Sequence, residues 1–192
     1  MHTKERILTE SMKLFSVYGY TAVSIRMIAK EVGVESSALY KHFKNKQAIF
    51  DAIVQRSEEQ FFQKYDEMSR IEINRAKDLE ELCLTMFRFQ TQDSWTSSFR
   101  KLLLQEKFAK PEIAAVYKKI FVDMPVQHQR KILEELIRRG ILRDANAEVM
   151  SLELYAPFYV YHIIEEDPKY LEDILRTHVN NFLASYVNGV IS

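Results

Sequence analysis

Residues that make turns are scarce in this sequence of 192 residues. It has only four glycines and four prolines, about a third of the share that is usual in globular proteins. β-Sandwiches, barrels and doubly wound sheets need such residues at each of many short connections. The scarcity argues against these folds and predicts an all-α protein.

Cysteine is nearly absent as well. Cys83 is alone, which excludes an intramolecular disulfide and a Cys-x-x-Cys pair. Because it stands between two leucines, we interpret it as a packing residue rather than a thiol sensor. No histidine pairs at i, i+4 with another histidine or a cysteine, so we predict no metal site. Nothing in the motifs indicates an enzyme or a bound cofactor.

Long apolar runs are missing too. The uncharged apolar stretch at 154–164 has 11 residues, whereas a helix needs about 20 to span a bilayer. The first residues carry mixed charges, and the apolar segment of an export signal does not follow them. We therefore expect no membrane partner and a cytoplasmic location.

Helix-starting and helix-ending residues divide the chain into about nine expected helices. The first three cover about Thr3 to Tyr18, Ile25 to Val32 and Ser36 to His42, with Ser24 as a cap and Gly33 as a stop. A longer fourth helix begins near Lys46. Further helices are expected at about 78–92, 94–108, behind Pro111, 149–164 and behind Pro168, while Pro125 either kinks a helix or starts another.

The last two expected helices are unusually apolar. Nearly every position of 149–164 is apolar, and 171–187 carries a broad apolar stripe at helical spacing. A helix that is apolar all round needs cover on every side. We predict a homodimer in which each protomer contributes these two helices, in preference to a self-contained core hairpin.

Residues 25–40 have the spacing of a helix-turn-helix motif. Ala29 is small where two helices cross closely, and Gly33 supplies the left-handed backbone conformation of the turn. The expected small core consists of Ile28, Val32, Val34 and Leu39.

The segment Leu39-Tyr40-Lys41-His42-Phe43-Lys44-Asn45-Lys46 closely resembles the block that ends the DNA-binding domain of the tetracycline-repressor (TetR) family of bacterial transcription regulators. Gly19-Tyr20-Thr21 and the residues around Ala29 and Gly33 also fit this family. The resemblance implies an N-terminal three-helix head at residues 1–46, which binds DNA. It also implies a helical region at residues 47–192 that binds an effector and dimerises.

The resemblance also assigns roles to individual residues. Tyr40, His42 and Lys46 are expected to contact phosphates, and Arg26 is expected to read guanine in the major groove. The full expected DNA-binding set is Ser24, Arg26, Ser36, Ser37, Tyr40, Lys41, His42 and Lys46.

The formal net charge of zero conceals two opposed regions. Residues 1–50 contain eight basic and four acidic side chains, a net charge of +4, and the remaining residues carry −4. A basic head agrees with a nucleic-acid partner.

The function implied by the resemblance is a repressor that binds a double-stranded DNA operator and is released by a small, largely apolar effector. A ligand-independent DNA-binding protein and a helical protein-interaction module remain as alternatives. The candidate effector contacts are residues that also suit an ordinary core: Trp95, Phe99, Phe121, Met124, Tyr155, Tyr159 and His162.

Overall fold

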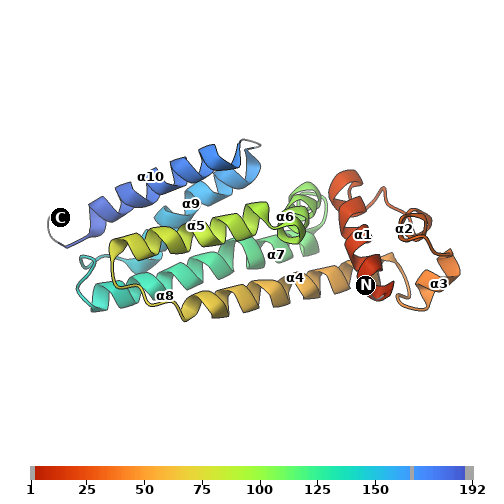
Figure 1. Ribbon diagram of the computed structural model, residues 1–192, viewed down its shortest axis with the longest axis horizontal. Helices are drawn as coiled ribbons and strands as arrows, with labels where there is room; N and C mark the ends of the chain where they lie inside the picture. Colours follow the sequence, from red (N-terminus) through yellow and green to blue (C-terminus); the bar gives the residue numbers. More distant parts are fainter. Residues whose placement is uncertain (1–2, 165–166, 189–192) are drawn as a thin grey trace. The chain divides into compact units, whose positions relative to one another are not determined.

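The computed structural model describes residues 3–164 and 167–188, and these residues are almost entirely helical (Figure 1). The helices are α1 (Thr3–Tyr18), α2 (Ile25–Val32), α3 (Ser36–Tyr40), α4 (Lys46–Ser69), α5 (Ala76–Gln92), α6 (Ser94–Glu106), α7 (Pro111–Lys118), the π-helix η1 (Lys119–Asp123), α8 (Met124–Arg138), α9 (Ala147–Ile163) and α10 (Pro168–Tyr186). The all-α prediction is confirmed. Within the described ranges there are ten α-helices and one π-helical segment, slightly more than the nine expected.

The chain forms two compact units. The first unit contains residues 1–64 and 93–120, and the second contains residues 65–92 and 121–192. The sequence predicts a different division, by function: a DNA-binding head at residues 1–46 and an effector-binding and dimerising region at residues 47–192. That division stays a prediction. None of the helices in the described part of the chain combines the length and apolar character needed to cross a membrane.

In the first unit, α1 packs against both α2 and α6. Ile7 and Phe15 of α1 are completely buried, as are Ile28 of α2 and Leu39 of α3. These side chains form a small core that fixes the three helices of the head.

In the second unit, α8 packs against α9, and α10 packs against both α5 and α9. Leu133, Leu154 and Leu175, on three different helices, are completely buried. Arg88 of α5 is held to α10 by two hydrogen bonds to the carboxylate of Glu172, at 3.0 and 2.6 Å.

Pro125 lies in the first turn of α8, directly behind η1. Proline has no N–H, so the carbonyl oxygen four residues earlier, that of Phe121, loses its usual helical donor. The Tyr155 hydroxyl of α9 donates to this oxygen at 2.6 Å instead. The proline therefore lies where α8 follows η1 without a non-helical residue between them, and a side chain replaces the missing backbone donor.

Candidate DNA-binding site

The turn between α2 and α3 forms as the sequence predicts. The Ser24 hydroxyl accepts a hydrogen bond from the Met27 N–H at 3.2 Å and so caps α2. Gly33 ends α2 with a φ of 73°, in the left-handed region. The Val34 N–H then donates to the Ala29 carbonyl at 2.9 Å. Local backbone chemistry thus sets how α3 follows α2.

The head is closed by side chains from all three helices. Ile28, Val32 and Leu39 are completely buried, whereas Val34 is only half-buried. Arg6 of α1 donates to the carbonyl oxygen of Val32 at the end of α2. This contact ties the first helix to the turn.

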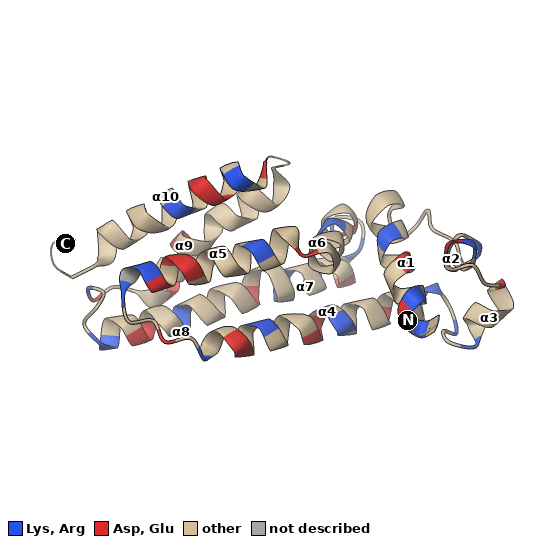
Figure 2. Cartoon of the chain, in the orientation of Figure 1, with Lys and Arg blue, Asp and Glu red and all other residues tan. Residues whose placement is uncertain are grey.

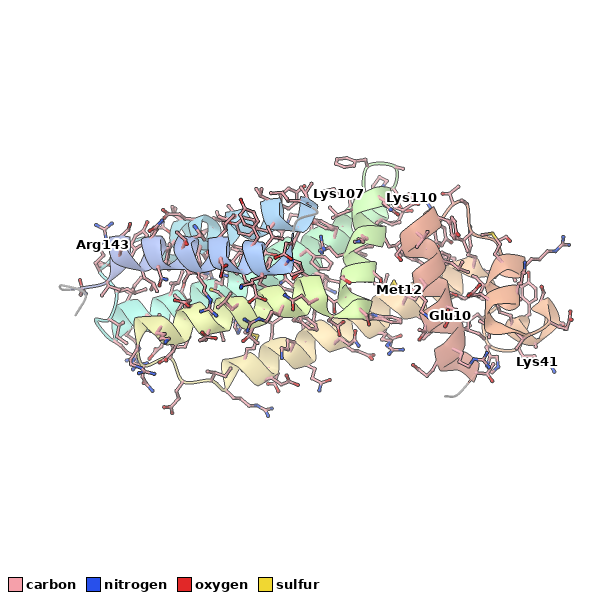
Figure 3. All side chains as sticks on the ribbon, turned by 45° about the horizontal axis from the view of Figure 1, so that its top comes forward. Glu10, Met12, Lys41, Lys107, Lys110 and Arg143 are labelled. Atoms are coloured by element: carbon pink, nitrogen blue, oxygen red, sulfur yellow. The ribbon has the colours of Figure 1, made fainter. Side chains whose placement is uncertain are left out.

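Six members of the expected DNA-binding set have side chains with no partner among the residues that the structure describes. Arg26, Ser37, Tyr40, Lys41 and His42 are exposed, and Ser36 is half-buried. In the described chain the six side chains make no hydrogen bond and no ion pair, so their polar groups are available to a ligand. They are Arg26, Ser36, Ser37, Tyr40, Lys41 and His42. Figure 3 shows Lys41 at the edge of the head.

The Ser24 hydroxyl oxygen already accepts the hydrogen bond that caps α2. The hydroxyl hydrogen remains available as a donor. Ser24 is exposed, so a DNA contact and the cap are compatible.

Lys46 is engaged differently from the other members of the set. Its ammonium donates to the carbonyl oxygens of Tyr20 at 2.8 Å, Thr21 at 3.3 Å and Val23 at 2.7 Å. An ammonium has three donors, and all three point to this loop. Lys46 therefore holds the segment before α2 against the start of α4, and its expected phosphate contact stays a prediction that this geometry disfavours.

Tyr20, in the same loop, contacts residues that sequence reasoning missed. Its N–H donates to the Glu106 carboxylate at 2.8 Å, and its hydroxyl donates to the side chain of Gln47 at 2.8 Å. The ammonium of Lys110, from the segment after α6 (Figure 3), lies 4.0 Å from the centre of its ring. Glu106 and Lys110 are about 90 positions away along the chain, and their local sequence shows no sign of this contact.

The lysines around Tyr20 also affect each other. Burial, followed by the charge of Lys110, lowers the pKa of Lys46 below its ordinary value, while Glu106 opposes this effect. The loop before α2 is thus held by a cluster of charged groups from α4 and from the end of α6.

The expected effector contacts fall in both units. Trp95 and Phe99 of α6 belong to the first unit, where Phe99 is completely buried. The indole N–H of Trp95 donates to the Ser57 hydroxyl at 2.9 Å, and the guanidinium of Arg56 lies 4.1 Å from the ring centre. Both aromatic residues are therefore buried in the first unit.

The other five candidates belong to the second unit. Phe121 and His162 are buried and meet edge to face, with ring centres 6.1 Å apart. Met124 and Tyr159 are half-buried. Tyr155 lines a small cavity of about 20 Å³ together with Tyr65, Gln90, His128 and Gln129. This space is the size of a water molecule, and the assignment of the seven residues to an effector pocket stays a prediction.

Cys83 is buried, and burial raises the pKa of its thiol to about 12. A thiol with this pKa stays protonated near pH 7 and is a poor nucleophile. Within the described residues, no group of three or more His, Cys, Asp or Glu side chains is placed to hold a metal ion.

One side of α9 is apolar and exposed, whereas the apolar stripe of α10 at Leu171, Leu175 and Val179 is buried within the chain and not left for a second copy. Val149, Leu152, Val160 and Ile163 of α9 are each at least half exposed, and so is Tyr170 of α10. Figure 2 shows that α9 carries few charged residues compared with α4.

The head and the helices that follow it define a class: a helix-turn-helix protein with a helical C-terminal region. The sequence profile of bacterial regulatory proteins of the tetR family matches residues 7–53. Sequence similarity to the tetR family is thus established for residues 7–53, about a quarter of the chain, which contain the helix-turn-helix.

Individual relatives agree with this assignment. The HTH-type transcriptional regulator YerO of Bacillus subtilis is 46% identical over 46 residues, which are 24% of this chain and 16% of YerO. The regulator AcrR of Shigella flexneri is 41% identical over 56 residues, 29% of this chain and 26% of AcrR. The matches to these two curated relatives thus span about a sixth and a quarter of their length.

Similarity in fold extends over the whole chain. SmeT, the repressor of the multidrug efflux pump SmeDEF of Stenotrophomonas maltophilia, is 25% identical, with a TM-score of 0.72 and coverage of 100% of this chain and 94% of SmeT. A structure of SmeT in complex with triclosan has a TM-score of 0.76 at 23% identity, over 99% of this chain and 94% of that one.

Proposed function

We propose that this protein is a sequence-specific DNA-binding transcription regulator of the repressor type. The observation that carries the proposal is the set of six polar side chains on α2, on α3 and directly after α3 that make no hydrogen bond and no ion pair within residues 3–164 and 167–188. A rigid helix-turn-helix unit presents them, and the first 50 residues have a net charge of +4. Arg26 supplies base recognition, with Ser36, Ser37 and Lys41 as further candidates at base edges, and Tyr40 and His42 supply contacts to the phosphate backbone.

Lys46 takes part indirectly in this proposal. By holding the carbonyl oxygens of the loop before α2, it positions α2 and with it Arg26. Ser24 caps the same helix, and its remaining donor is close enough to the helix start to reach a phosphate.

Binding to selected and random DNA tests the proposal. An operator is first selected from a random duplex library, and its affinity is then compared with that of scrambled DNA over a range of salt concentrations. We expect much tighter binding to the selected site and an affinity that falls steeply with salt. Affinity that is absent, or independent of salt, contradicts the proposal and favours the alternative of a helical protein-interaction module.

The functional unit that we propose is a homodimer formed by α9 and α10. The exposed apolar side chains of α9, with Tyr170 of α10 beside them in sequence, need a partner, and a second copy presents the same surface. Two heads in such a dimer dock in major grooves about 34 Å apart, one turn of DNA. The selected operator is then expected to be palindromic.

We further propose that a small molecule releases the protein from its operator. SmeT has the same fold, and its complex with triclosan supports the proposal that a protein of this fold binds a small molecule. Coupling between a ligand and DNA is typically worth about 1–3 kcal/mol. If every small molecule that stabilises the protein leaves its operator affinity unchanged, the alternative of a ligand-independent DNA-binding protein is favoured.

A further inference from the structure

The second unit contains a groove that none of the expected effector contacts lines. It has a volume of about 650 Å³ and lies between the end of α4, the connection to α5, and α8. Volumes of about 300–1,000 Å³ are usual for small-molecule sites. The groove is therefore large enough for a compact organic ligand.

Four apolar side chains form part of the groove. Ile73 and Leu136 are buried, and Ile132 is half-buried. Ile71, by contrast, is 51% exposed. A ligand with an apolar body would cover Ile71 and gain the free energy of removing apolar surface from water.

Basic side chains in the groove are only partly neutralised. Arg138 donates to both carboxylate oxygens of Glu135, at 2.8 and 2.6 Å, so these two charges form a pair. Arg139 instead donates to the carbonyl oxygen of Ile73 at 2.7 Å and the amide oxygen of Asn74 at 2.9 Å, which are both uncharged acceptors.

Lys131 is the other basic residue of the groove. In the described chain its ammonium makes no hydrogen bond and no ion pair. Glu72 is the one acidic residue of the lining besides Glu135. Lys131 and Arg139, which have no carboxylate partner in the described chain, therefore outnumber the acidic side chains that remain. The groove favours an anion.

His128 lines both this groove and the small cavity beside Tyr155. Its Nε2 is buried and has no hydrogen-bond partner in the described chain. Burial, followed by the charge of Lys131, lowers the pKa of His128, so the ring is neutral near pH 7. A neutral imidazole offers one donor or one acceptor at Nε2 to a ligand that reaches it.

We infer that the groove binds a small amphipathic carboxylate, with its apolar body against Ile71 and Ile132 and its carboxylate at Lys131. An apolar body explains the exposed isoleucine, and a negative charge explains the two cations that no carboxylate neutralises. The role of this ligand as the effector rests on the proposed function, whereas its binding does not.

Calorimetry on the full chain, without DNA, tests the site. The probes are octanoate and phenylpropanoate, with octanol and octylammonium as neutral and cationic counterparts, all below the concentration at which they form micelles. We expect one acid molecule per chain, at least about tenfold tighter binding of octanoate than of octanol, and no binding of octylammonium. Failure of both acids to bind, or equal affinity for acid and alcohol, overturns the inference.

Two variants localise the binding. Lys131→Gln is expected to weaken octanoate about tenfold and to remove the preference over octanol. Ile71→Glu, at an exposed position, is expected to abolish binding of octanoate while circular dichroism shows an unchanged helix content. The control Lys169→Gln removes an equally exposed charge from α10 and is expected to bind as the unmodified protein does. Unchanged binding by Lys131→Gln overturns the assignment of the carboxylate to Lys131.

Operator affinity separates this inference from the proposed function. Measured without octanoate, operator affinity tests the proposed DNA binding alone. With saturating octanoate, we expect it to fall at least fivefold in the unmodified protein and much less in Lys131→Gln. Octanoate that binds in the groove without changing operator affinity overturns the role of the groove as an effector site.

Discussion

The ammonium of Lys46 donates to the carbonyl oxygen of Val23 at 2.7 Å, across the connection between the head and α4. Together with its bonds to Tyr20 and Thr21, this contact satisfies three backbone acceptors in a loop that has no regular structure of its own. The start of α4 and the entry to α2 are therefore mechanically linked through one side chain.

Replacing Lys46 by methionine keeps the length of the side chain and removes its donors. Because partly buried carbonyl groups lose their partner, we expect the free energy of unfolding to fall by about 1–3 kcal/mol. The salt dependence of DNA binding is expected to stay unchanged, since the three donors of the ammonium are already bound to carbonyl oxygens. Urea denaturation and affinity measured over a salt series check this. A salt slope reduced by about one, with unchanged stability, would instead show a phosphate contact.

Arg26→Ala is expected to relax sequence preference. Arg26 is exposed on α2, and its side chain makes no hydrogen bond and no ion pair within the described chain. A bidentate contact to guanine contributes about 1–3 kcal/mol to discrimination between bases, so affinity for the selected operator falls by that amount while affinity for scrambled DNA changes less. Lys77→Ala, which removes a charge of the same sign from α5, serves as the control. Equal losses on both DNAs would refute base recognition by Arg26.

The sequence predicts the parts of the head that depend on neighbouring residues. Ser24 caps α2 and Gly33 ends it because both effects act over three or four positions, within reach of a local pattern. For Pro125 the sequence offers two outcomes, and the Tyr155 hydroxyl that donates to the Phe121 carbonyl oxygen in place of the missing N–H is about 30 residues away.

The sequence alone does not predict the roles of residues whose partners lie far away along the chain. Lys46 resembles a phosphate-binding residue of the family, yet the three carbonyl groups that it contacts are more than 20 positions away along the chain. Trp95 and Phe99 suit a ligand pocket by residue type, but their type equally suits the buried positions that they occupy. The groove beside Lys131 combines residues from α4, α8 and the segment between α4 and α5, so no single stretch of sequence reveals it.

Leu152→Glu combined with Val160→Glu is expected to yield a monomer. Both side chains are 50% exposed in the single chain, so the charges cost little in folding, but they place like charges on both surfaces of the proposed interface. Light scattering coupled to gel filtration gives the mass, and circular dichroism checks the fold. Phe108→Glu, at a position that is 89% exposed in the first unit, is the matched control. A folded double variant that remains a dimer would contradict an interface on α9.

His128→Gln is expected to reduce the loss of stability in mild acid. Burial lowers the pKa of His128 below its ordinary value of 6.5, so the unfolded chain takes up a proton more readily than the folded protein does. The unmodified protein therefore loses stability as the pH falls below about 6.5, and this contribution is fully present above that pH. Urea denaturation between pH 7.5 and 5 compares the variant with His42→Gln, which changes an exposed histidine of the head. Identical pH profiles for all three proteins would show that His128 contributes nothing to the acid response.

Gly33→Ala and Gly140→Ala form a matched pair. Both glycines have left-handed backbones, with φ values of 73° and 72°. A Cβ at Gly33 would lie 4.0 Å from the Arg6 guanidinium, and one at Gly140 would have no atom within 4 Å. Neither change creates a clash, so we expect each to cost about 1–2 kcal/mol from backbone conformation alone.

The two glycine variants differ in their expected effect on DNA. Gly33 sets how α3 follows α2, and the expected DNA contacts lie on both helices, so a shift of this turn is expected to weaken operator binding at least tenfold. Gly140, which follows α8 in the second unit, is expected to leave operator affinity unchanged at a temperature where both variants are folded. If both variants lose stability equally and both retain full operator affinity, the turn at Gly33 does not position a DNA-binding surface.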